Sequence, residues 1–253
     1  MFVAIFQKLP RLSMLQLLSE IETSEDPGIS IYIPAGSAES EIKSILSIVS
    51  KEEMVSGILN QIVTSHTGAV LFWGEHYKYL ILPPFSIIEK VIYQDYCTGP
   101  LFTLLNKDLI VALVLVRLGN YAIGVFQKET LISCKVGTGI IHSRHKKGGS
   151  SSQRYARHRD KQIEYFFSRI CTHIQEQLNP VHKSIDFLYY GGEKFTIRLF
   201  RAQCAFLKEF DNRAADVLLN VRDPRQASLK SAIREVWASN IISWQEREER
   251  TDI

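Results

Sequence analysis

Residues 108–139 read DLIVALVLVRLGNYAIGVFQKETLISCKVGTG and carry the strongest strand signal in the chain. β-Branched and aromatic residues dominate three consecutive runs, as is typical of strands. Gly119-Asn120, between the first two runs, is a turn signal. We therefore predict two or three neighbouring antiparallel strands in this stretch.

Strand and helix signals alternate after these strands. A long helix is predicted to end at Asn179-Pro180, followed by a strand at 185–192, a helix from about Phe195 to Phe210, a strand at 214–221 and a helix from Ser228 to about Ile242. This order completes an α/β layer structure. The core face of the long helix, defined by three- and four-residue steps, comprises Tyr155, Ile163, Phe166, Phe167, Ile170, Ile174 and Leu178.

The first third of the chain also alternates strand and helix signals. GISIYIPAG (28–36) predicts a strand, residues 38–64 a helical segment and residues 67–84 a hairpin. The pattern breaks at Thr98-Gly99-Pro100, which suggests a boundary near residue 95. We predict an α/β, mixed α+β protein with an N-terminal domain at 1–95, a second domain at 96–245 and a tail at 246–253. The second domain is expected to be a mixed sheet flanked by helices, with a protruding Gly-Gly loop that leads into the long helix.

Positive charge is concentrated in one segment. The 253 residues carry a net charge of +3, but His142 to Arg169 contains eight Lys and Arg against two acids, and the rest of the chain is slightly acidic. A localised basic excess fits the phosphates of RNA or DNA, and an anionic membrane less well. The alternative is an ordinary solvated charged face. A basic stripe at helical spacing consists of Arg154, Arg157, His158 and Lys161.

The cysteines and the apolar runs narrow the class of protein. Cys97, Cys134, Cys171 and Cys204 lie more than thirty residues apart without a CxxC pair, so we expect reduced, buried thiols and no zinc knuckle. The sequence opens with no leader pattern, and the apolar run at 109–116 is too short to span a bilayer. A cytoplasmic location without a membrane partner is expected.

Residues 142–159, HSRHKKGGSSSQRYARHR, contain few groups for conventional catalysis. They have no carboxylate pair, no Ser-His-Asp order and no HExxH spacing, so we expect neither a metal nor a cofactor. His142, His145 and His158 could be ligands, but solvated histidines are the more common case in a phosphate-binding stretch. The two glycines fit either a loose loop tip or close backbone approach to a ligand.

The sequence around these glycines resembles a known family. Gly-Gly, small residues and then QRYARHRDKQIEYF (153–166) are similar to the peptidyl-tRNA-hydrolysing central domain of eukaryotic and archaeal class-I termination factors. That signature is Gly-Gly-Gln-Ser followed by an Arg-aromatic-Ala-Arg helix. The matching residues here are Gly148, Gly149, Arg154, Tyr155, Ala156, Arg157 and Arg159.

One departure from that signature points to a particular branch. Ser150 follows the glycines, and the glutamine comes three residues later as Gln153. This arrangement resembles the release-factor-like family of ribosome quality control, which includes yeast Vms and in which a small-residue spacer precedes the functional glutamine. The resemblance covers about 130–175 and, by the order of elements, 106–245, whereas 1–95 resembles nothing we can quote.

The resemblance implies a peptidyl-tRNA hydrolase that acts on stalled large ribosomal subunits. Gln153 would position water at the ester, with Ser150 as the competing residue, while Gly148 and Gly149 would let the loop enter a narrow RNA-lined channel. Its implied partners are the ribosome, peptidyl-tRNA and ribosomal RNA. The phosphate-binding residues would be Arg144, Lys146, Lys147, Arg154 and Arg157, with His158 and Lys161 on the same stripe.

Two other functions fit the same residues. A nuclease could cut the CCA end of tRNA at this loop, and a non-catalytic ribosome-binding or RNA-binding module could use the loop as a basic anchor. Codon-dependent termination is not predicted, because nothing in the chain resembles the Asn-Ile-Lys-Ser codon-reading loop.

Overall fold

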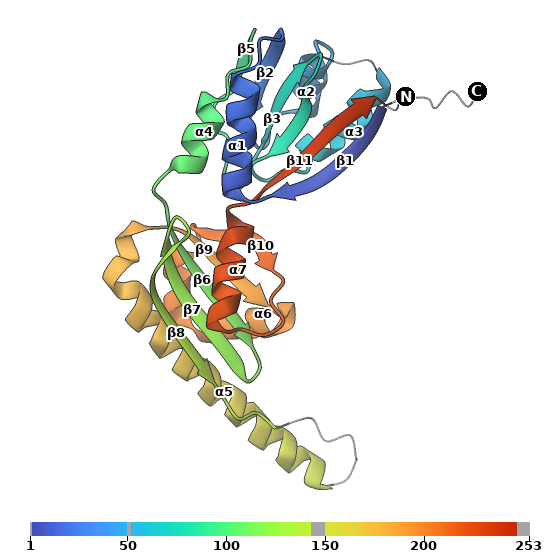
Figure 1. Cartoon of the computed structure of the whole chain (residues 1–253). Helices are drawn as coiled ribbons and strands as arrows, with labels where there is room; N and C mark the ends of the chain where they lie inside the picture. The colour runs from blue at the N-terminus through green and yellow to red at the C-terminus, as the bar shows by residue number, and fades with distance from the viewer. Residues whose placement is uncertain (1, 50–51, 143–149, 247–253) are drawn as a thin grey trace, which may run out of the picture. The chain divides into compact units, whose positions relative to one another are not determined.

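A computed structural model describes residues 2–49, 52–142 and 150–246 (Figure 1). The chain forms two compact units, one running to Lys107 and resuming at Glu235, the other spanning Asp108–Arg234. Each unit has one sheet accompanied by helices, so the predicted α/β, mixed α+β class is confirmed. Within the described residues, no helix combines the length and the apolar character needed to cross a membrane.

The first unit is built on a six-stranded antiparallel sheet with the order β1-β11-β4-β3-β2-β5. Helices α1 and α4 lie on one face, and α2 and α3 lie on the other (Figure 1). The strands are β1 (Phe2–Leu9), β2 (Gly28–Ile33), β3 (Ala69–Gly74), β4 (Lys78–Leu82), β5 (Val91–Tyr93) and β11 (Ser239–Glu246). The helices are α1 (Arg11–Glu22), α2 (Glu39–Leu46), α3 (Glu52–Val63) and α4 (Gly99–Asn106).

Most of the sequence signals in this unit are confirmed. The predicted strand at 28–36 is β2, which ends before Pro34, and the predicted hairpin is the β3–β4 pair. The helical segment at 38–64 is divided into α2 and α3. Both helices cover the sheet through aliphatic side chains, since Ile42, Ile45 and Ile58 pack into the same core cluster as Leu71.

The second unit is built on a mixed five-stranded sheet with the order β10-β9-β6-β7-β8. The β6–β7 and β7–β8 pairs are antiparallel, as predicted for residues 108–139, while β9 runs parallel to β6 and to β10. The strands are β6 (Ile110–Arg117), β7 (Asn120–Gln127), β8 (Thr130–Thr138), β9 (Ile185–Gly192) and β10 (Ala214–Leu219).

Helices cover both faces of this second sheet. Phe166 and Ile170 of α5 share a core cluster with Phe200 of α6, whereas Leu229 of α7 packs against Gly124 on the opposite face of β7. Residues 111–116 of β6 are consequently fully buried, which explains their continuous apolar run. The helices are α5 (Ser150–Leu178), α6 (Lys194–Gln203) and α7 (Gln226–Val236), with 3-10 turns η1 (Asn179–Ser184) and η2 (Ala205–Phe210).

The C-terminal segment differs from its predicted conformation. The helix predicted from Ser228 to about Ile242 ends at Val236, and residues 239–246 form β11 between β1 and β4. Pairing on both sides satisfies the backbone groups of this segment, and Ile241 and Ile242 are buried. Pairing with strands distant in sequence therefore overrides the local helical pattern.

The compact units also differ from the predicted ranges of 1–95 and 96–245. Strand β11 returns the end of the chain to the first unit, and that unit continues through α4 to Lys107. Arg11 at the start of α1 ties α4 to it, because its Nε donates to the carbonyl of Leu105 at 2.6 Å and its Nη2 donates to Asn106 Oδ1 at 2.6 Å.

The expectation of four reduced cysteines is wrong for two of them. Cys171 on α5 and Cys204 at the end of α6 form a disulfide, with Cα atoms 5.6 Å apart. Their separation in sequence hides this pair, but α5 and α6 pack together in the core. Cys97 and Cys134 are free and half-buried.

Candidate nucleic-acid interface

The first turns of α5 extend beyond the sheet of the second unit (Figure 1). Residues 153–158 are all exposed, and Phe166 is the first fully covered side chain of the helix. Tyr155, predicted to face the core, is 55% exposed because the helix has no strand beneath it at this point. The side chains of residues 153–158 are therefore accessible at the surface.

The projecting segment carries part of the predicted site. The predicted site residues that are exposed on α5 are Gln153, Arg154, Arg157, His158 and Lys161. Ser150 is the first residue of α5, so the predicted small-residue loop ends earlier than expected and Gln153 is held in the first helical turn. The remaining predicted site residues, Arg144, Lys146, Lys147, Gly148 and Gly149, lie outside the described residues.

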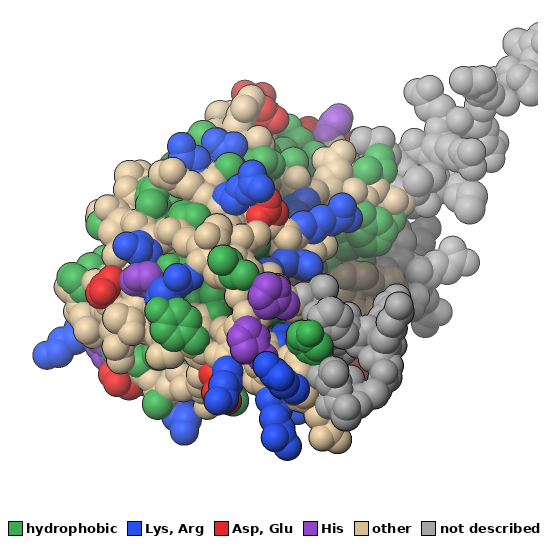
Figure 2. All heavy atoms as spheres, turned by 90° about the horizontal axis from the view of Figure 1, so that it is seen from below, with side chains coloured by type: hydrophobic (Ala, Val, Ile, Leu, Met, Phe, Trp, Pro, Cys, Tyr) green, Lys and Arg blue, Asp and Glu red, His purple; other side chains and the backbone are tan. Residues whose placement is uncertain are grey.

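The basic stripe follows one side of this helical segment. From Gln153 to Lys161 the sequence has four Lys and Arg but one acid, and Arg154, Arg157 and Lys161 recur at helical spacing. Figure 2, seen from below, shows Lys and Arg side chains gathered beside histidines on this face. Exposed cations on one surface attract phosphates without reading base sequence.

Two hydrogen bonds tie the segment after β8 to α5. The Nε of Arg159 donates to the carbonyl of His142 at 3.0 Å, and the backbone N–H of His142 donates to Gln162 Oε1 at 3.1 Å. The chain is thus fastened to the helix at His142 and enters it again at Ser150. Sequence reasoning missed Gln162, although its spacing of three residues from Arg159 places both on one face.

The histidines of this region are not gathered into a metal centre in the part of the chain that the structure describes. The rings of His142 and His158 have centroids 6.1 Å apart, and among the described residues no group of three or more His, Cys, Asp and Glu side chains could hold a metal ion.

Two glycines let β8 approach the aromatic rings beneath α5. A Cβ on Gly137 would lie 2.2 Å from the Tyr121 hydroxyl, and one on Gly139 would lie 2.4 Å from the ring of Phe166. Arg169 fastens the same strand to α5 by donating from Nη2 to the carbonyl of Thr138. The glycines of the Gly-Thr-Gly sequence at 137–139 therefore allow close packing against aromatic rings. They do not form a dinucleotide-binding loop.

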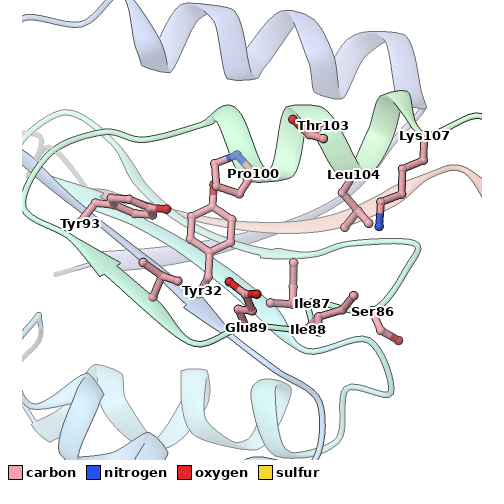
Figure 3. Close-up of a pocket in the computed structure, with 11 residues that line it drawn as sticks. Tyr32, Ser86, Ile87, Ile88, Glu89, Tyr93, Pro100, Thr103, Leu104 and Lys107 are labelled. Carbon is pink, nitrogen blue, oxygen red and sulfur yellow. The ribbon is translucent and has the colours of Figure 1, made fainter.

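The first unit has a separate cavity of about 550 Å³ beside β5 and α4 (Figure 3). The rings of Tyr32 and Tyr93 meet edge to face there, with centroids 6.1 Å apart. The Tyr32 hydroxyl donates to the carbonyl of Cys97 at 2.7 Å, and burial raises the pKa of this phenol. A neutral, hydrogen-bonded phenol offers no proton transfer near pH 7. Glu89, before β5, and Lys107, after α4, also line the cavity (Figure 3).

Comparison with protein families places this chain in a class of release-factor-like proteins. Residues 110–242 match the model of the Actinobacteria/chloroflexi VLRF1 release factor. This match covers more than half of the chain, so the protein belongs to the VLRF1 release factor family. The resemblance to release-factor-like proteins that the sequence indicated is confirmed.

The solved structures that match the chain share little sequence with it. An archaeal translation termination factor, aRF1, is 17% identical, with 90% of this chain and 73% of that one covered and a TM-score of 0.41. The Vms1 mitochondrial localization core is 12% identical, with 92% and 94% covered and a TM-score of 0.44. Pelota from Archaeoglobus fulgidus is 10% identical, with 83% and 61% covered and a TM-score of 0.31. The curated proteins gave no match.

Proposed function

We propose that this protein is a ribosome-associated peptidyl-tRNA hydrolase that releases nascent chains from stalled large ribosomal subunits in the cytoplasm. The observation that carries the proposal is the position of Gln153, exposed in the first turn of α5 and adjacent to Arg154, in a member of the VLRF1 release factor family. Within the segment 153–161, this glutamine is the side chain with an uncharged amide.

The proposed reaction is simple hydrolysis. A water oxygen bonds to the peptide carbonyl carbon, the bond from that carbon to the ribose 3' oxygen breaks, and a proton moves from the water to the departing oxygen. The Gln153 amide can accept a hydrogen bond from the water and donate one to a developing oxyanion. The amide of Gln153 is neither an acid nor a base near neutral pH, so its contribution to the rate would come from positioning the water.

The helix supports this role of Gln153. The N–H groups of the first three residues of an α-helix have no intrahelical acceptor, and Gln153 follows them as the fourth residue of α5. Its side chain and these N–H groups would together face a substrate at the helix start. Arg154 and Arg157 would bind phosphates of peptidyl-tRNA or ribosomal RNA, with Lys161 one turn further along, and the glycines at 148 and 149 would allow entry into an RNA-lined channel.

Single-turnover peptide release from a stalled ribosome complex tests the proposal. Gln153→Ala should slow release on the order of 10²-fold while binding, measured by co-sedimentation, stays unchanged, because one oriented hydrogen-bonding group is removed. Gln175→Ala is the matched control, since Gln175 is an exposed glutamine near the other end of α5. Ser150→Ala should be mild.

Other outcomes would assign a different function. Full release by the Gln153→Ala protein would remove Gln153 from the chemistry, and release lost only together with binding would make the surface an anchor. The mass of the product separates hydrolysis from cleavage of tRNA. Hydrolysis leaves the CCA end intact, whereas a nuclease leaves nucleotides on the peptide.

A further inference from the structure

A cavity of about 420 Å³ lies between α5 and the end of β8, close to the basic stripe. Its α5 residues recur at i, i+3, i+4 and i+7, so they form one face of the helix. That face adjoins the stripe, because His158 and Gln162 are one turn apart, as are Lys161 and Tyr165. The lining residues are Thr138, Gly139, Ile140, Gln162, Tyr165, Phe166 and Arg169.

Exposed apolar groups form the walls of this cavity. Tyr165 is 72% exposed and Ile140 is 83% exposed, while Phe166 beneath them is buried and in close contact with Gly139. Tyr165 therefore contributes little to the core of the unit. An exposed aromatic ring beside a basic surface is a platform on which a nucleobase can stack.

Two of the side chains that line the cavity, Gln162 and Arg169, carry hydrogen-bond donors. The Gln162 Oε1 accepts from the backbone of His142, and its Nε2 has no acceptor among the described residues. The Arg169 Nη2 donates to the carbonyl of Thr138, while its Nε is buried without a hydrogen-bond partner in the described part of the chain. A ligand that brings acceptors could pair with the Gln162 amide nitrogen and with the guanidinium of Arg169, which lines the cavity.

From these observations we propose that the cavity binds one unpaired nucleotide of a single-stranded RNA. The base stacks on Tyr165 and presents ring nitrogens or carbonyl oxygens to Gln162 and Arg169, while the adjoining phosphates lie along the basic stripe. The inference rests on the proposed function and extends it. It assigns to the same helix a second contact, which begins at Gln162. This residue is nine positions from Gln153, or about 14 Å along the helix axis at the α-helical rise.

Single-stranded RNA is the ligand that these observations favour over a peptide. Its bases supply flat apolar faces together with acceptors, and its backbone supplies the negative charge that the stripe of Arg154, Arg157 and Lys161 attracts. Double-stranded RNA lacks the first property, because its bases are stacked on one another and their edges are paired. The proposal therefore predicts discrimination between the two forms.

The test uses the full chain and a labelled single-stranded RNA oligonucleotide, with affinity measured by fluorescence anisotropy at one fixed salt concentration. Tyr165→Leu should weaken binding roughly ten-fold, because a stacked base is lost, while Tyr165→Phe keeps the ring and should bind like the wild type. The substituted side chain is exposed, so the fold should tolerate both changes. Phe195→Leu is the matched control, because Phe195 is an exposed aromatic residue on α6, outside both the cavity and the basic stripe.

Three results would overturn the stacking site. These are wild-type affinity of the Tyr165→Leu protein, equal losses for the Leu and Phe variants of Tyr165, or an equal loss for Phe195→Leu. With a duplex of the same sequence, the Tyr165 effect should vanish. An effect confined to oligonucleotides ending in CCA would assign the site to the tRNA acceptor end, and an effect independent of that end would assign it to ribosomal RNA.

The same variants separate this inference from the proposed function. If the stacking site is wrong, RNA binding ignores Tyr165 while peptide release still depends on Gln153. If the hydrolase proposal is wrong, Gln153→Ala leaves release unchanged or release is absent, while single-stranded RNA binding still depends on Tyr165.

Discussion

The Tyr121 hydroxyl and Nδ1 of His173 lie 2.6 Å apart and join β7 to α5. The two rings are stacked, with centroids 5.7 Å apart, and Tyr121 is 1% exposed. Burial lowers the pKa of His173, and the nearby positive charges of Lys135 and Arg169 lower it further, while Glu176 has the opposite effect. The imidazole is therefore neutral at pH 7, and its Nδ1 can accept the phenol proton in a hydrogen bond.

This pair predicts a loss of stability in mild acid. A histidine whose pKa is lowered in the folded state takes up a proton more readily in the unfolded state. Protonation therefore favours unfolding, and the free energy of unfolding falls as pH drops below about 6.5 toward the folded-state pKa. His173→Gln removes that titrating group and should make the fall in melting temperature between pH 7 and pH 5 shallower than in the wild type. His66→Gln, a change at an exposed histidine, should leave the wild-type pH profile unchanged. Parallel profiles for wild type and His173→Gln would refute the assignment.

The disulfide predicts a specific count of reactive thiols. Under denaturing conditions without reductant, a thiol reagent should detect Cys97 and Cys134 only, and after reduction it should detect all four cysteines. Cys204 is 1% exposed within the core of the second unit, so Cys204→Ser should lower the free energy of unfolding by roughly 2–4 kcal/mol. Cys134→Ser is the control and should change stability little. Four thiols before reduction would show that the bond does not form in solution.

The strands at 110–138 could be predicted from sequence because several local signals agree. β-Branched residues, the turn at Gly119-Asn120 and burial of β6 on both faces all favour the same antiparallel arrangement. Strand β11 could not be predicted in this way, since its partners β1 and β4 lie far away in the sequence. The Cys171–Cys204 bond was missed for the same reason, because only the packing of α5 against α6 brings the two residues together.

The candidate site shows the same division between local and distant information. The stripe of Arg154, Arg157 and Lys161 follows from helical spacing alone, and the structure leaves it exposed. The cavity beside Tyr165 depends on the end of β8 lying against α5, which no local pattern encodes. Tyr155 was assigned to the core because spacing defines a helix face but cannot show where the sheet beneath it ends.

The exposed stripe predicts how binding to RNA depends on salt. Arg154→Glu combined with Arg157→Glu removes two exposed cations from the projecting segment of α5, so, if they bind phosphates as proposed, affinity for tRNA should fall at every salt concentration. The slope of log affinity against log salt should also become shallower by roughly 2, because fewer counterions are released.

The control for this experiment must change the net charge equally. Lys208→Glu combined with Lys230→Glu does so at two exposed lysines of the same unit that lie on η2 and α7 and not on the basic stripe. If binding follows net charge alone, both double variants should lose the same affinity and the same slope. If α5 holds the phosphates, the control keeps nearly the wild-type slope while the Arg154 and Arg157 variant loses it. An unchanged slope in the arginine variant would show that the RNA binds elsewhere on the chain.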